Sequence, residues 1–403
     1  MLSRGRLAFI LSSLAVLLLV VGGSLWAATS RAQDDGRDSL YKYLSVFTEV
    51  LKLIDRAYVD ETDPDVLMGG ALEGVTDALG PFSTYVPASR VDDFVASREV
   101  GTRHSGLLVL KERGVAYAMS VVPGSPAAEA GIERGDLIAT IQGRRTRPMP
   151  VWEIQALLAG PPGTRIELHR IRMGEQADVA FTLAEFPPPG TLLEVRRGVP
   201  VLRLRAIGDA TPGDVETSLE TLRGEGPSFP DLSHPDKLVL DLRDLAQGDP
   251  AAAYRVAELF AGGGELGVLR DRDEVLETFT SDAEPSFSGS LVVLINRGTQ
   301  GAAEVLASVL HQRLGAQLIG EPTFGHCGRP SLVPLSNGDR LEVTTAFFTG
   351  PDREPIDDGL EPDEIVRPRT FTLDEEAPDD DPVLERALEV VLGEVGVERK
   401  KAA

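Results

Sequence analysis

The chain has 403 residues, of which 42% are hydrophobic and 26% are charged, and its formal net charge is −23. This length suits two to four globular domains, and the acidic balance argues against nucleic acid as a partner, because phosphates need a basic surface. The single cysteine, Cys327, excludes an intramolecular disulfide but does not exclude export from the cytoplasm.

Residues 1–33 are predicted to be a targeting or anchoring segment. Arg4 and Arg6 precede an apolar body at residues 7–28, and small residues flank Arg31 at a possible cleavage site. A membrane span needs about 20 apolar residues, whereas the core of a signal peptide has roughly 7–15. The segment is therefore either an N-terminal membrane anchor or a cleaved signal peptide. Both alternatives place the rest of the chain in the cell envelope, in the periplasm or another extracytoplasmic space.

Residues 38–100 are predicted to be a helical N-terminal region. Apolar side chains recur there at the spacing of one helix face: Leu44, Phe47, Leu51, Ile54 and Tyr58. A second helix is expected from Pro64 to Leu79, where Gly80 and Pro81 disfavour its continuation. We expect an amphipathic helix pair that contributes to a core.

Residues 101–185 resemble a PDZ domain. The most specific segment reads VPGSPAAEAGI from Val122 to Ile132. In it Ser125 and Pro126 begin a short helix, and Gly131 permits a left-handed termination. PDZ domains bind the carboxy terminus of a peptide by adding it as a strand to a sheet edge. The resemblance therefore implies that the partners are protein or peptide C-termini.

The peptide groove is expected between a strand that includes Leu107–Val109 and a helix at Val151–Leu158. Backbone N–H groups in the loop before the strand would hold the peptide carboxylate. The residues predicted to bind the peptide are Gly106, Leu107, Leu108, Val109 and Trp152. The side chains of Trp152, Ile154 and Leu158 either line the pocket or simply pack in the core, since buried aromatic side chains usually pack rather than bind.

Residues 190–370 alternate apolar strand patterns with helix patterns after the proline-rich junction at residues 187–190, which predicts an α/β layer. Strands are expected at 199–204, 238–242, 291–295 and 317–319, a hairpin at 332–346, and helices at 251–260 and 302–314. Residues 371–403 are predicted to form an acidic loop followed by a helix from Pro382 to Leu392.

The strand Leu291–Ile295 leads into Asn296-Arg297-Gly298-Thr299-Gln300-Gly301-Ala302-Ala303-Glu304. This segment resembles the nucleophile segment of the carboxyl-terminal processing proteases, the S41 serine peptidases. The resemblance implies an α+β multidomain protein: an N-terminal helical region, a PDZ domain and an α/β core of the ClpP/crotonase-like type. In the family the catalytic serine lies three residues before the glutamate. Counting back from Glu304 gives Gly301, which has no side chain.

The resemblance also implies a Ser–Lys dyad, in which a lysine held neutral by burial takes the proton of the serine. The family frame around that lysine is kept in Gly320–Gly325, so the lysine position is His326 and the position of its orienting glutamine is Pro330. The family's Asn-Pro-Gly core after the strand at 238–242 is replaced by Leu245-Ala246-Gln247. Support for an oxyanion would then rest on the backbone N–H of Gln247.

These replacements predict an inactive homologue that binds C-termini or unfolded tails and that acts beside an active relative or an adaptor. The alternative is an active serine-type endopeptidase with a rearranged site, in which Thr299 or Cys327 replaces the serine. A third interpretation is a structural envelope protein with a vestigial groove. No His, Cys or carboxylate stands at ligand spacing with His326, so neither a metal nor another cofactor is expected.

Overall fold

The computed structural model describes residues 41–187, 190–226, 229–367 and 381–394. The predicted anchor or signal at residues 1–33 lies outside these residues, as does most of the acidic loop. Among the helices of the described residues, none is both long and apolar enough to cross a membrane. The chain divides after Leu72 into two compact units.

The N-terminal region is helical, as predicted. Residues 41–57 form one helix, and α2 spans Pro64–Asp77. The Asp63 carboxylate accepts a hydrogen bond from the N–H of Asp65 at the start of α2, and the helix ends just before Gly80, whose φ is +104°. The expectation that the apolar side chains of these two helices are buried in a core is wrong for several of them: Leu44 is 51% exposed and Tyr58 is 60% exposed. Periodic spacing predicts a helix face but does not show what covers it.

The second unit begins within α2 and contains the domain that the sequence predicts to be a PDZ domain. Before this domain lie β1 (Thr84–Val86) and α3 (Val91–Val100). The strands of the domain are β2 (Leu107–Glu112), β3 (Val115–Val121), β4 (Leu137–Ile141), β5 (Arg144–Arg145), β6 (Arg165–Arg172) and β7 (Glu175–Thr182), and its helices are α4 (Pro126–Glu129) and α5 (Val151–Leu158). The sheet order is β2-β3-β4-β6-β7, so β2 lies at an edge.

The predicted local chemistry of the PDZ segment is confirmed. The hydroxyl of Ser125 accepts a hydrogen bond from the N–H of Ala128 at 3.3 Å, Pro126 follows as the first helical residue, and Gly131 has a φ of +80°. Helix α5 has the bounds expected from the sequence.

The core is built on a six-stranded sheet of order β17-β14-β13-β10-β9-β8. Its strands are β8 (Leu192–Arg196), β9 (Val199–Arg203), β10 (Lys237–Asp241), β13 (Ser290–Ile295), β14 (Gln317–Gly320) and β17 (Glu364–Ile365). All neighbouring pairs are parallel except the edge pair of β8 and β9. A parallel sheet is normally buried on both faces, which explains why these strands read as continuous apolar runs.

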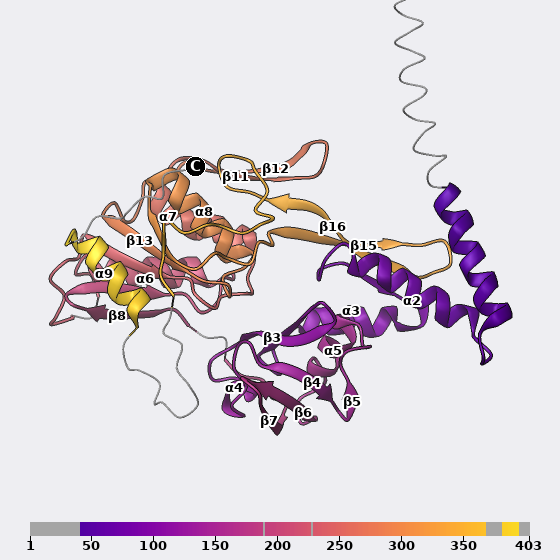
Figure 1. The fold of residues 1–403 in the computed structure, drawn as a ribbon. Helices are drawn as coiled ribbons and strands as arrows, with labels where there is room; N and C mark the ends of the chain where they lie inside the picture. The colour runs from indigo at the N-terminus through magenta and orange to yellow at the C-terminus, as the bar shows by residue number, and fades with distance from the viewer. Residues whose placement is uncertain (1–40, 188–189, 227–228, 368–380, 395–403) are drawn as a thin grey trace, which may run out of the picture. The chain divides into compact units, whose positions relative to one another are not determined.

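Helices cover both faces of this sheet (Figure 1). These are α6 (Thr211–Leu222), α7 (Pro250–Ala261), α8 (Ala302–Leu314) and α9 (Pro382–Leu392). Leu238 and Leu240 of β10 pack with α6, α7 and α8, whereas Val239 between them packs with α9. Alternate side chains of a strand point to opposite faces, so each strand contributes to both cores.

A second sheet of the core contains β1, β11 (Gly264–Arg270), β12 (Val275–Ser281), β15 (Gly328–Pro334) and β16 (Arg340–Phe348). The hairpin of β15 and β16 was expected from the sequence, whereas β11, β12 and α6 were not. Strand β12 is largely exposed, so it lacks the apolar run that marks a buried strand.

Candidate functional site

Gly301 lies at the junction of β13 and α8, at the N-cap of the helix, with φ +59° and ψ −116°. L-residues that carry a side chain rarely adopt this backbone conformation. A Cβ added at this position would lie 3.5 Å from the backbone oxygen of His326 and would have no other neighbouring atom within 4 Å. The junction therefore has room for a side chain, although its backbone would be strained by one.

Glu304 holds the loop that follows β14 against this junction. Its carboxylate is fully buried and accepts hydrogen bonds from the N–H groups of Gly301 (2.9 Å), Gly325 (2.6 Å) and His326 (3.0 Å) and from the hydroxyl of Thr323 (2.5 Å). Burial raises the pKa of Glu304, although these hydrogen bonds oppose the increase. This role has a signal in the sequence, because a Glu at the third position of a helix is a capping signal.

His326, which the family resemblance assigns to the lysine position, directs its ring to aromatic neighbours. The imidazole stacks on Phe82 with ring centroids 3.3 Å apart, and Phe82 also meets Phe324 edge to face. Burial lowers the pKa of His326 to about 4, so the ring is neutral at pH 7. A side chain that began at Gly301 would meet the backbone oxygen of His326, and no atom of the imidazole would lie within 4 Å of its Cβ.

Phe82 was not singled out as a site residue by the sequence reasoning. It belongs to the turn between α2 and β1, and the neighbouring residues of β1 pair with β16. The pairing of Thr84 with Glu342 connects this turn to the core sheet.

Thr299 and Cys327 are both tied into the structure. The hydroxyl of Thr299 is fully buried, donates to the carbonyl of Leu242 at 2.9 Å and accepts from the N–H of Asn296 at 3.0 Å. Cys327 is 1% exposed, and burial raises the pKa of its thiol well above the ordinary range. Reactive cysteines need an accessible thiolate, which this environment disfavours.

The thiol of Cys327 faces the carbonyl oxygen of Gly301 at 3.4 Å and the carboxylate of Glu304 at 3.6 Å. His326 and Cys327 thus direct their side chains to different neighbours, as expected for adjacent residues of an extended segment. Pro330 is exposed on β15, next to an irregularity in the pairing with β16. Proline is tolerated there because its missing N–H falls at a bulge.

The loop after β10 still lies against the start of α8. A Cβ added at Gly248 would lie 2.8 Å from the Cβ of Ala302. Among the described residues, the backbone N–H groups of Gln247 and Ala302 have no hydrogen-bond acceptor. Two unpaired N–H groups on adjoining segments are the kind of donors that can hold a carbonyl oxygen.

The structure separates the residues predicted to bind a peptide in the PDZ domain. The side chains of Leu107 and Val109 are fully buried in the domain core, so only their backbone is available at the edge of β2. Ile154 and Leu158 belong to the same core, which supports the core alternative for these two side chains.

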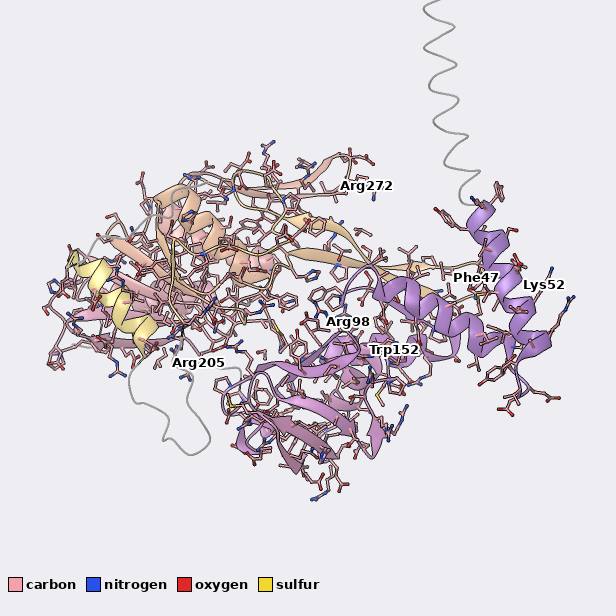
Figure 2. All side chains as sticks on the ribbon, in the orientation of Figure 1. Phe47, Lys52, Arg98, Trp152, Arg205 and Arg272 are labelled. Atoms are coloured by element: carbon pink, nitrogen blue, oxygen red, sulfur yellow. The ribbon has the colours of Figure 1, made fainter. Side chains whose placement is uncertain are left out.

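Trp152, labelled in Figure 2, is 7% exposed and packs with Val86 and Phe94. Phe94 belongs to α3, so the indole lies on the face of α5 directed at that helix. This packing favours the core alternative for Trp152, and its contact with a peptide stays a prediction.

The loop before β2 has partners of its own. The N–H of Gly106 donates to the carbonyl of Thr102 at 2.7 Å, and the N–H of Leu107 donates to the hydroxyl of Ser105 at 3.3 Å. A peptide carboxylate bound here would have to replace these contacts.

Comparison with known proteins shows which family shares these domains. The profile of "Peptidase family S41" matches residues 198–366, and that of "PDZ domain" matches residues 117–169. A carboxyl-terminal-processing protease of Synechocystis sp. is 30% identical over 293 residues, which are 71% of this chain and 67% of that protein. A carboxy-terminal-processing protease of Bartonella bacilliformis is 26% identical over 363 residues, 87% of this chain and 82% of that one.

Among solved structures, a photosystem II D1 C-terminal processing protease matches with a TM-score of 0.63 at 24% identity, covering 86% of this chain and 96% of that one. This match confirms the predicted α+β fold class, with N-terminal helices, a PDZ domain and an S41 core. The fold and site thus define a PDZ-containing S41 peptidase homologue. Within that class, the chain belongs to the carboxyl-terminal processing protease family.

Proposed function

We propose that this protein is a non-catalytic member of its family, which captures protein C-termini or unfolded tails without cleaving them. The observation that carries the proposal is Gly301 at the nucleophile position. Formation of an acyl-enzyme needs a side-chain nucleophile at the reacting carbonyl, and glycine supplies none.

The surroundings of Gly301 support the same conclusion. His326 is neutral at pH 7, but it stacks on Phe82 instead of facing the position where a serine would lie. The two alternative nucleophiles, Thr299 and Cys327, are buried and hydrogen-bonded. The unpaired N–H groups of Gln247 and Ala302 fit a site that holds a peptide carbonyl but has nothing to attack it.

The proposal also includes a cellular location and the proteins that this chain binds. The apolar segment at residues 7–28 supports a location in the cell envelope, as an anchored or secreted protein. The PDZ domain supports capture of free C-termini, and an active relative or an adaptor would then receive the captured protein. Fusion of residues 1–40 to alkaline phosphatase tests the location: phosphatase activity supports export, and its absence contradicts it.

Proteolysis is the direct test. The full chain is incubated with casein, an unfolded substrate, and separately with a fluorophosphonate probe that labels activated serines. We expect neither cleavage nor labelling, while the Synechocystis relative serves as the positive control. Turnover that disappears in Thr299→Ala or Cys327→Ala would overturn the proposal and identify the replacement nucleophile in the alternative, active enzyme.

Tail capture has its own test. Binding of peptides with a free carboxy terminus is compared with binding of the same peptides after amidation. A hydrogen bond to a charged group contributes about 1.5–3 kcal/mol, so amidation is expected to weaken binding about tenfold or more. Equal binding of both forms would reject carboxylate capture. No binding of either form would favour the third interpretation, a structural envelope protein with a vestigial groove.

A further inference from the structure

A side chain of α5 is hydrogen-bonded to the backbone of β2 in the PDZ domain. The amide Nε2 of Gln155, on the second turn of α5, donates to the backbone carbonyl of Val109 in β2 at 2.7 Å. The contact is partly buried, and it joins the two elements between which a peptide strand is expected to enter.

Val109 presents its backbone to the open edge of β2. The N–H of Val122 donates to the carbonyl of Gly106, so the backbone of Gly106 faces β3. In an antiparallel pair the backbone groups of successive residues point alternately toward and away from the partner strand. Leu107 and Val109 therefore direct their N–H and C=O groups away from β3, and the sheet order gives β2 no second strand neighbour among the described residues.

A peptide that extends this sheet must use the same groups. Its main-chain N–H groups would donate to outward carbonyls of β2, and the carbonyl of Val109 is already accepting from Gln155. Lys111 of β2 contacts the segment before α5, since its Nζ donates to the carbonyls of Arg147 and Met149 at 2.9 Å each. The strand is thus joined to α5 through Gln155 and to the segment before α5 through Lys111.

We propose that Gln155 is a latch, which must release the Val109 carbonyl before a peptide main chain can pair with β2. The proposal rests on tail capture by the PDZ domain, as proposed above, and adds how entry to that groove is controlled. Because the latch hydrogen bond is made only in the empty groove, its free energy is subtracted from the free energy of peptide binding. Removing the amide should therefore strengthen binding.

The test uses the full chain and four fluorescein-labelled heptapeptides of sequence Gly-Ser-Gly-Ser-Ala-Ser-X, where X is Ala, Val, Leu or Phe with a free carboxylate. Fluorescence anisotropy gives the Kd of the wild type, of Gln155→Met, which keeps the side-chain length without the donor, and of Gln155→Ala. The matched control is Gln142→Met, because the Nε2 of Gln142 donates to the carbonyl of Arg165 elsewhere in the same domain.

We expect both Gln155 variants to bind the best of the four peptides about fivefold more tightly, the amount that one net hydrogen bond contributes, with Gln142→Met unchanged. If the wild type binds and the Gln155 variants bind equally or more weakly, the latch is overturned while tail capture stands. If neither the wild type nor the variants bind any of the four peptides, both proposals are overturned. Circular dichroism melting curves of all variants exclude loss of folding as the cause.

Discussion

The sharpest test of the site is the return of a hydroxyl to position 301. Gly301→Ser places a side chain on a backbone with φ +59° and ψ −116°. The added Cβ would meet only the backbone oxygen of His326, at an ordinary contact distance of 3.5 Å. Crowding therefore contributes little, and the cost is the conformational strain of an L-residue in this region, about 1–3 kcal/mol.

We expect urea denaturation, followed by far-UV circular dichroism, to show a loss of about 1–3 kcal/mol for Gly301→Ser. Gly208→Ser is the matched control, because Gly208 has open space around it and no positive φ. The same substitution there should change stability by less than about 0.5 kcal/mol. An equal stability of Gly301→Ser and the wild type would refute the assignment of strain to this junction.

The same variant is expected to remain inactive on casein, because the imidazole of His326 stacks on Phe82 and Pro330 has no donor that could orient a base. The triple variant with Gly301→Ser, His326→Lys and Pro330→Gln is expected to show weak activity at best, because its serine would stand on the strained backbone of position 301. Hydrolysis by Gly301→Ser alone, abolished by a further His326→Ala, would show that His326 is a working base and that the mechanism is only one substitution from activity.

Three further predictions concern the buried groups around Gly301. The pKa of His326 is near 6.5 in the unfolded chain and about 4 in the folded chain, so lowering the pH stabilises the unfolded state. Between pH 7 and pH 4.5 the free energy of unfolding should fall by about 2–3 kcal/mol more in the wild type than in His326→Phe, which keeps a ring on Phe82. Equal pH profiles of the two proteins in urea titrations would contradict this. Cys327 should not react with Ellman's reagent in the native protein and should react fully in denaturant, and rapid native labelling would show that the thiol is accessible. Glu304→Gln should lower the free energy of unfolding by about 3 kcal/mol or more in the same urea titrations, because the NH₂ of the new amide would face backbone N–H donors. A loss below about 1 kcal/mol would mean that the carboxylate does not hold the loop.

Much of the fold follows from local sequence patterns. Helix α9 has the bounds predicted from the sequence, and the structure shows local signals at both ends: Asp381 caps its start, Pro382 is its first residue, and Gly393 ends it in a left-handed conformation. The junction of β13 and α8 was predicted for a similar reason, since an apolar strand gives way to a helical pattern at a glycine. These signals act over a few residues and need no knowledge of distant partners.

The resemblance to a family motif also predicted that the nucleophile position falls at Gly301, which carries no hydroxyl. It could not establish whether another group replaces it. That answer depends on contacts between distant segments, such as the hydrogen bond from Thr299 to Leu242 and the stacking of His326 on Phe82. No local pattern encodes which of several polar side chains finds a buried partner, because the partner is supplied by another strand or turn.

The PDZ domain shows the same division. The resemblance to PDZ domains predicted the strand and the helix of the groove, and the turn chemistry was predicted from Ser125, Pro126 and Gly131, which act locally. Only the tertiary structure decided that Trp152 packs with Phe94 of α3 and that Gln155 donates to the carbonyl of Val109. The rotation of α5 about its axis determines both, and that rotation is fixed by packing against α3 on one side and β2 on the other, which neither segment specifies alone.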